Sequence, residues 1–142
     1  GAIFVRGIGA ELSDGAPHGP RSWDYDDYTT MAADGRQGLN GDIVVLDPTS
    51  GKALELSSMG IRVDASAMLR QAKAAGMPKD ALESPFHQQV LDGSLPPCIG
   101  GGIGQSRVAM LLLRKMHIGE VQCSVWPEKM VEEYRQAGCT LL

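Results

Sequence analysis

Residues 42–57 read DIVVLDPTSGKALELS, and this stretch decides the fold. Residues 42–46 and 53–57 are apolar runs of strand length, and the Pro-Thr-Ser-Gly segment between them is typical of a turn. The sequence therefore predicts a β-hairpin in which Asp47 pairs with Lys52 across the turn.

Two acidic residues of this hairpin, Asp42 and Glu55, are candidates to bind a cation. With Asp47 opposite Lys52, they become diagonal neighbours on one face of the hairpin, roughly 7–8 Å apart at the backbone. Two carboxylates at that separation can share a hard cation such as Mg²⁺. A register slip of one residue would place them on opposite faces, and a pair of solvated acidic side chains is the alternative interpretation.

Outward from the hairpin, the pattern of apolar residues, glycines and prolines predicts further strands and helices. The helix at 105–115 is apolar on all sides and is therefore expected to be buried. Hairpins and helices are intermixed without regular βαβ alternation, which favours an α+β fold with an antiparallel sheet flanked by helices. The expected elements are strands at 2–8 and 121–126 and helices at 66–75, 82–91, 105–115 and 128–137.

Composition and charge limit the classes of function. The 142 residues leave room for one domain, and a formal net charge of -4 provides no basic field for nucleic acid or an anionic membrane. No apolar run is long enough to span a bilayer. Three cysteines without paired metal spacing favour a reducing, cytoplasmic compartment. Because the chain opens directly in an apolar strand, we expect further strands of its sheet outside these residues.

The segment at 11–40 is rich in Gly, Asp and Pro and is interpreted as an active-site loop with little regular structure. Its aromatic residues argue against a disordered insertion. The acidic run at 24–27, which includes Asp26 and follows Arg21, could bind an ammonium group. A solvated acidic loop is the alternative.

Two arginines could contact an anionic ligand. Gly60 permits a sharp exit from the second hairpin strand, so that Arg62 could reach back to a carboxylate or phosphate. Arg107 enters the apolar helix after the glycine-rich run 100–104, and a charged residue there is costly unless it is paired or faces a ligand. A surface arginine and a structural salt bridge are the respective alternatives. The three histidines, His18, His87 and His117, show no metal spacing and are expected to be structural.

Taken together, these motifs resemble the C-terminal portion of the type A, ammonia-dependent asparagine synthetases over nearly the whole chain. The block at 100–107 also resembles the third motif of the class II aminoacyl-tRNA synthetases. The matching blocks are GIG at 7–9, LSDG at 12–15, DYDD at 24–27, GLNGDI at 38–43, ELSSMGIRVD at 55–64, GGGIGQSR at 100–107 and HIGEVQ at 117–122.

The resemblance implies a class II synthetase-like catalytic fold, of which residues 1–142 would be the C-terminal part of a single domain. It implies a ligase that converts L-aspartate and ammonia to L-asparagine with ATP and Mg²⁺, through a β-aspartyl-adenylate, releasing AMP and pyrophosphate. The implied partners are the missing N-terminal half and a second copy in a homodimer, with no nucleic acid or membrane.

The resemblance also implies roles for individual residues. Asp26 would take the α-amino group of aspartate, and Arg62 would act with Asp26 and Arg107 in catalysis. The substrate-binding set would be Asp26, Arg21, Ser57, Ser58 and Arg62. The nucleotide-binding set would be Asp42, Glu55, Gly102, Gly104 and Arg107, with Asp42 and Glu55 also holding Mg²⁺.

Two other interpretations stay open at this point. A class II aspartyl- or asparaginyl-tRNA synthetase core would share the fold and the adenylate chemistry, but it needs a basic surface for tRNA. A non-catalytic paralogue that only binds an amino acid or a nucleotide is the second alternative.

Overall fold

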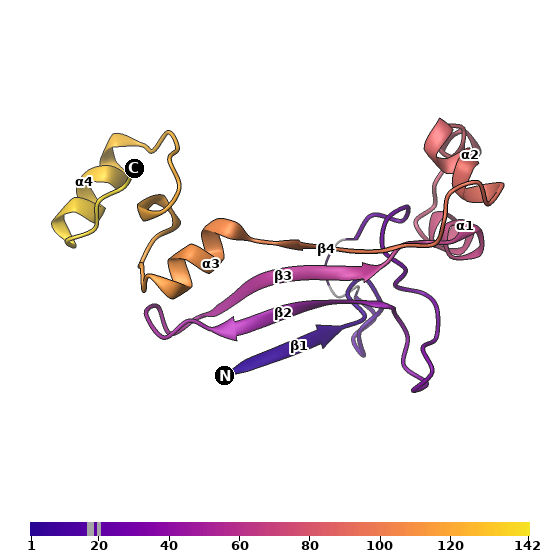
Figure 1. Cartoon of the computed structure of the whole chain (residues 1–142), viewed down its shortest axis with the longest axis horizontal. Coiled ribbons are helices and arrows are strands. Elements are labelled where there is room, and N and C mark those ends of the chain that lie inside the picture. Colours follow the sequence, from indigo (N-terminus) through magenta and orange to yellow (C-terminus); the bar gives the residue numbers. More distant parts are fainter. Residues whose placement is uncertain (17–18, 20) are drawn as a thin grey trace. The chain divides into compact units, whose positions relative to one another are not determined.

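Four strands form one sheet in the order β1-β2-β3-β4. They are β1 (Ala2–Arg6), β2 (Asn40–Leu46), β3 (Ala53–Ile61) and β4 (Ile99–Ile103). Their directions alternate along the chain, so the sheet is antiparallel (Figure 1). The predicted antiparallel α+β fold is therefore confirmed in this computed structural model, which describes residues 1–16, 19 and 21–142. His18 lies outside the described residues. The observed neighbour of β1 is β2, and the expectation of further strands outside this chain stays a prediction.

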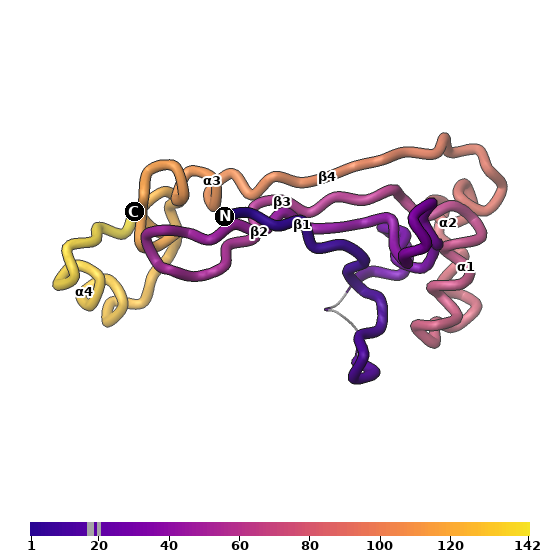
Figure 2. Tube along the Cα trace, turned by 90° about the horizontal axis from the view of Figure 1, so that it is seen from below, coloured from indigo at the N-terminus to yellow at the C-terminus, as the bar shows by residue number. Residues whose placement is uncertain are grey.

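The hairpin forms with the predicted turn register. The Asp47 amide donates to the Lys52 carbonyl at 2.9 Å. The Asp47 carboxylate closes the turn by accepting from the Thr49 and Ser50 amides at 3.0 and 3.1 Å. Figure 2 shows the two strands side by side from a second direction. Turn chemistry alone therefore determines how β2 and β3 meet at the hairpin.

The chain divides into two compact units. One comprises residues 1–3, 43–57 and 103–142, and the other comprises residues 4–42 and 58–102. The second unit contains a small core of Val63, Ala67 and Met68.

Helices α1 (Ala65–Ala74) and α2 (Pro85–Leu91) build this core, and both views place them side by side (Figures 1 and 2). A 3-10 turn, η1 (Lys79–Leu82), precedes α2. The predicted helices at 66–75 and 82–91 are thus confirmed, with α2 beginning at its proline as the missing amide of Pro85 allows. Val90 and Leu91 of α2 pack against the core. Leu69 of α1 is exposed, whereas Gln71 is buried in the core-facing surface.

The first unit carries α3 (Gln105–Leu112), η2 (Ile118–Glu120) and α4 (Glu128–Gln136). The predicted terminal helix is confirmed. The expectation that α3 is buried is wrong for the described chain, because none of its residues is buried. The strand predicted at 121–126 is also wrong. This segment has no strand partner among the described residues, and Val125 within it is 96% exposed.

Candidate active site

The acidic loop, which comprises the acidic run at 24–27 and the adjoining residues 23, 28 and 29, is joined to the end of β3 by backbone hydrogen bonds. Asp26 and Arg62 form an isolated antiparallel bridge. The Asp27 amide donates to the Ile61 carbonyl, and the Val63 amide donates to the Tyr25 carbonyl, both at 2.9 Å. Within the loop predicted at 11–40, residues 25–27 therefore run alongside the end of β3.

Asp26 of this loop is buried and forms an ion pair with the partly buried Arg62, which follows β3. Asp26 is only 4% exposed, and its Oδ1 accepts from Nη1 of Arg62. Tyr25 holds the same guanidinium from a second side, with its hydroxyl 3.0 Å from Nη2 and its ring centroid 3.8 Å from Cζ. A buried charge pair of this kind is costly unless it is well hydrogen-bonded, and cation–π contact adds to the attraction. The two residues predicted to contact the substrate thus lie together.

Glycines allow this close packing. A Cβ added at Gly60 would lie 2.7 Å from Cγ of Asp26, and one added at Gly100 would lie 2.3 Å from Nη2 of Arg62. Gly60 was expected to mark a sharp exit from the strand, but it lies inside β3. The glycine is required there for close approach of the acidic loop and not for a turn. Residues 100–103 of the glycine-rich run belong to β4, a strand that was not predicted.

A second cluster joins Arg21, Asp42 and Ser58. Nη2 of Arg21 lies 2.7 and 2.8 Å from the two carboxylate oxygens of Asp42 and 3.2 Å from Oγ of Ser58. Nε of Arg21 is buried and has no hydrogen-bond partner among residues 1–16, 19 and 21–142. Ser57 is buried next to this cluster in sequence. An arginine bound tightly to a carboxylate, with one N–H unused, can still receive an anionic ligand.

A third cluster lies in the other unit and joins Arg107 to Glu55. Nη1 of Arg107 donates to the Glu55 carbonyl at 2.9 Å and to Oε1 at 3.3 Å. Both side chains are 46% exposed, so the pair is weak and can open for a ligand. Arg107 lies in the first turn of α3, as predicted, next to Gly104, whose amide donates to the Leu56 carbonyl at 2.8 Å. A Cβ added at Gly102 would meet no described atom within 4 Å.

The chemistry of these carboxylates is compatible with Mg²⁺, which usually takes one or two carboxylates together with phosphate oxygens. Glu55 is half-exposed and shares one carboxylate oxygen with Arg107, whereas Asp42 is buried and bound by Arg21. Within residues 1–16, 19 and 21–142, no group of three or more His, Cys, Asp or Glu side chains is close enough to hold a metal without other ligands. A shared cation at Asp42 and Glu55 stays a prediction.

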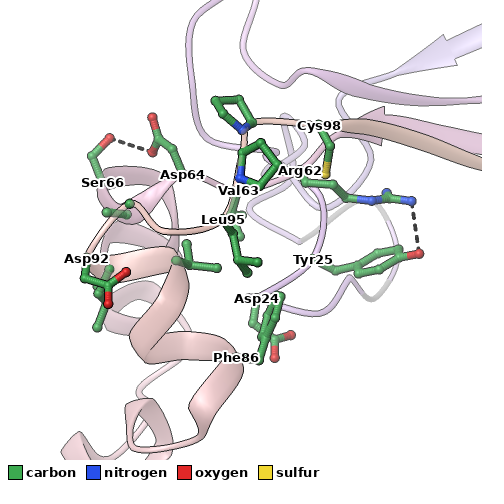
Figure 3. A pocket seen from close by; sticks show the side chains of 16 residues that line it. Asp24, Tyr25, Arg62, Val63, Asp64, Ser66, Phe86, Asp92, Leu95 and Cys98 are labelled. Carbon is green, nitrogen blue, oxygen red and sulfur yellow. Dashed lines mark hydrogen bonds between the residues drawn. The ribbon is translucent and has the colours of Figure 1, made fainter.

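A cavity of about 640 Å³ opens beside the Arg62–Tyr25 pair, and sequence reasoning did not anticipate it. Figure 3 shows the Arg62 guanidinium pointing to the Tyr25 hydroxyl at one wall, while Phe86 and Leu95 supply apolar surface. Its residues come from the acidic loop, the end of β3, α1, and residues 86–98. The sequence does not reveal this cavity, because its walls come from segments that are far apart in the chain.

Asp24, at the wall of this cavity, is linked to α2. Its Oδ2 lies 2.9 Å from Nε2 of His87, and its Oδ1 accepts from the Ser22 hydroxyl. Burial alone would raise the pKa of Asp24, but the hydrogen bonds from Ser22 and His87 lower it below the usual range. His87 is buried against Trp23, with ring centroids 4.8 Å apart. His117 caps η2. Both described histidines therefore have the structural surroundings expected.

Three arginine–carboxylate clusters thus join Arg62 to Asp26, Arg21 to Asp42 and Arg107 to Glu55. The family model for aspartate–ammonia ligase matches residues 1–138. The chain is 52% identical over 144 residues to a curated aspartate–ammonia ligase of Parabacteroides distasonis, a match that covers 100% of this chain and 41% of that protein. The chain belongs to the aspartate–ammonia ligase family and spans about two-fifths of the length of this curated relative.

Solved structures with a similar arrangement include two of Entamoeba histolytica asparaginyl-tRNA synthetase. One is 20% identical with a TM-score of 0.47, and the match covers 72% of this chain and 22% of that chain. The other, in complex with asparaginyl-adenylate, is 21% identical with a TM-score of 0.47, covering 72% and 21%. None of the helices in the described part of the chain has the length and apolar character needed to cross a bilayer.

Proposed function

We propose that the complete protein containing this chain is an ATP-dependent ligase that forms L-asparagine from L-aspartate and ammonia. The observation that carries this proposal is the ion pair between buried Asp26 and Arg62, whose guanidinium lines a cavity, in a chain of the aspartate–ammonia ligase family. A carboxylate and a guanidinium held together can bind the α-ammonium and a carboxylate of one amino acid.

In this proposal, the cluster around Asp26 binds the substrate aspartate. Oδ1 of Asp26 is bound by Arg62, and within the described residues no donor contacts Oδ2. Oδ2 would accept from the α-ammonium of aspartate, a charge-assisted bond that contributes about 1.5–3 kcal/mol. Arg62, Arg21, Ser57 and Ser58 would contact the substrate carboxylates or the phosphate. With its α-amino end held here, the side-chain carboxylate of aspartate is the group left to react.

The nucleotide would be bound by Arg107, with Gly102 and Gly104 forming the floor and Asp42 and Glu55 near the phosphates. The weak, half-exposed Arg107–Glu55 pair supports this assignment, because exchanging one surface partner for a phosphate costs little. Mg²⁺, when bound, would neutralise charge that develops on the phosphates. Arg107 would supply a fixed positive charge to the same transition state.

The chemistry proceeds in two balanced steps. A β-carboxylate oxygen of aspartate forms a bond to the α-phosphorus of ATP, and the bond to the pyrophosphate oxygen breaks. The nitrogen of ammonia then bonds to the β-carbonyl carbon, the carbon–oxygen bond to AMP breaks, and the nitrogen loses a proton. Ammonia needs no docking surface, which agrees with a net charge of -4. We further propose a cytoplasmic homodimer with no nucleic-acid partner.

The test supplies the complete protein with aspartate, ATP, Mg²⁺ and ammonium, with and without tRNA. Free asparagine and AMP should appear without tRNA, and Asp26→Ala should largely abolish them because the ammonium loses its partner. The matched control is Asp34→Ala, which removes another arginine-paired carboxylate of the same loop, exposed and bound to Arg6 at 2.5 Å. Product formation by this control should stay near wild type. Aspartyl-tRNA or asparaginyl-tRNA as the only product would contradict the proposal.

A further inference from the structure

One polar residue of α1 is fully buried although the helix face around it is apolar. Gln71 is 0% exposed, and its buried neighbours on α1 are Ala67, Met68 and Ala72. Burying an amide is unfavourable unless its hydrogen-bonding groups are paired. An apolar residue could fill the same position without needing hydrogen-bond partners. The groups that bind the Gln71 amide therefore indicate its role.

The hydrogen-bond partners of the Gln71 side chain among the described residues lie in the acidic loop. Its Nε2 donates to the carbonyls of Trp23 at 2.8 Å and Asp26 at 3.1 Å. Its Oε1 accepts from the Tyr28 amide at 2.9 Å and the Thr29 hydroxyl at 3.2 Å. The two N–H donors and two acceptor positions of the amide are thereby all used.

These bonds surround the residue that carries the proposed substrate contact. Trp23 precedes Asp26 in the loop, Tyr28 and Thr29 follow it, and one bond reaches the Asp26 carbonyl itself. The Asp26 backbone is thus held by a helix on one side and by the Arg62 bridge at the end of β3 on the other. Residues 23–29 contain no regular helix or strand of their own. Their backbone position therefore depends on hydrogen bonds to neighbouring elements such as these.

We propose that Gln71 is a positioning residue for aspartate, which fixes the backbone of residues 23–29 so that the Asp26 carboxylate meets the substrate ammonium. This inference rests on the proposed function. A misplacement of about 1 Å in a binding carboxylate is enough to reduce catalysis strongly. Loss of the amide should therefore affect aspartate and leave ATP recognition unchanged, because none of the side-chain hydrogen bonds of Gln71 involves a residue proposed to bind the nucleotide.

The first test replaces Gln71 by Met, which has a similar length and no hydrogen-bonding amide, in the complete protein. Aspartate-dependent ATP–pyrophosphate exchange is the assay because it needs no ammonia. The KM for aspartate should rise by about 10-fold or more, while the KM for ATP stays within about twofold of wild type. The control, Ala72→Gly, weakens the same buried helix face without touching the loop. It should lower the Tm and leave the aspartate KM unchanged.

A second variant, Gln71→Glu, keeps an acceptor but turns a carboxylate toward two carbonyl oxygens. Burial favours the protonated acid, which can donate one hydrogen bond again. As the pH falls from about 8 to about 6, the aspartate KM of this variant should therefore decrease toward the wild-type value, unlike that of Gln71→Met. This variant also keeps the test available if Gln71→Met does not fold.

A direct measurement separates this inference from the proposed function. Hydrogen exchange of the amides at 23–29 should accelerate in Gln71→Met and not in Ala72→Gly. If the wild-type protein shows no aspartate-dependent ATP–pyrophosphate exchange, the proposed function is refuted. The hydrogen-exchange data would then still test whether Gln71 holds the backbone of residues 23–29. A folded Gln71→Met protein with normal aspartate KM, or with equal increases in both KM values, would overturn the positioning role. So would unchanged amide exchange.

Discussion

At the scale of single residues, the site depends on where side chains are absent as much as on where they are present. Gly60 lies beneath Asp26 and Asn40, and Gly100 lies beneath the Arg62 guanidinium. The space that a Cβ would fill at these positions is occupied by the acidic loop and its arginine. Two residues that sequence reasoning gave no role, Tyr25 and Gln71, hold Arg62 and Asp26 from other directions.

We expect Gly60→Ala to destabilise the protein. Its Cβ would lie 2.7 Å from Cγ of Asp26 and 2.9 Å from Cβ of Asn40, and neither atom is the end of a flexible side chain. Forcing an extra methyl into a packed site costs about 1–3 kcal/mol. Urea unfolding of the complete protein measures this directly.

The comparison variant is Gly102→Ala, because no described atom lies within 4 Å of its added Cβ. Its free energy of unfolding should stay within about 0.5 kcal/mol of wild type. If Gly102 forms the floor under the nucleotide, as proposed, the KM for ATP should nevertheless rise. An unchanged KM for ATP would remove Gly102 from the nucleotide site.

At the scale of elements, α1 and α2 begin where short polar side chains accept from free amides. Asp64 caps α1 by accepting from the Ala67 amide at 2.7 Å, and Ser84 caps α2 by accepting from the His87 amide at 3.2 Å. These caps determine where α1 and α2 start, and so where Gln71 and His87 face the acidic loop. The site is therefore supported by local signals that lie outside it.

The Asp64 cap should make stability depend on pH. The hydrogen bond from the Ala67 amide, together with that from the Ser66 hydroxyl, lowers the pKa of Asp64 below its usual value. Its contribution is therefore present above the unfolded pKa of about 3.9 and is lost as the pH falls through the lower folded value. Asp64→Ala should cost about 1 kcal/mol at neutral pH. In urea titrations, the difference from wild type should shrink below about pH 3; a constant difference would contradict this origin.

Elements were predicted best where the deciding signals are local. The hairpin register follows from the turn at Asp47, and α4 ends before Gly138, which has a φ of +80°. The strand expected at 121–126 failed because an alternating pattern does not create a strand without a neighbour to pair with. Conversely, β4 was not predicted, because glycine has a low strand propensity. Pairing with β3 in the sheet overrides that propensity.

At the scale of the whole molecule, most of the proposed substrate residues lie in one unit of the chain, whereas the proposed nucleotide residues are divided between the two units. Asp26, Arg62, Arg21 and Asp42 lie in one, and Glu55 and Arg107 lie in the other. Two cavities have been characterised, and neither is lined by Asp42, Glu55 or Arg107. The curated relative is also much longer than this chain.

We therefore expect residues 1–142 expressed alone to show no measurable ATP–pyrophosphate exchange, whereas the complete protein does. Isothermal titration with ATP should likewise detect tight binding only in the complete protein, because the exposed Arg107–Glu55 pair lacks an enclosing pocket. Circular dichroism provides the control that the short chain retains its helices and strands. Full exchange activity in a folded short chain would contradict this expectation.

The sequence by itself determined the family, the antiparallel α+β character, the hairpin register and most helix boundaries. Those features depend on periodicity, turn residues and caps, whose effects act within a few positions along the chain. It also identified the arginines and carboxylates, but as separate candidates. Only the tertiary structure decided that Arg62 pairs with Asp26, Arg21 with Asp42 and Arg107 with Glu55.

The same is true of Gln71, to which the sequence assigned no role. Its bonds to Trp23 and Asp26 join residues 48 and 45 positions apart in the chain. Pairings at such separations are decided by which surfaces the fold brings together, because a buried polar group must find its partner wherever packing places one. The difference has a physical reason. Helices, strands and turns depend on interactions between residues close in sequence, whereas the contacts between these elements depend on which surfaces become buried together.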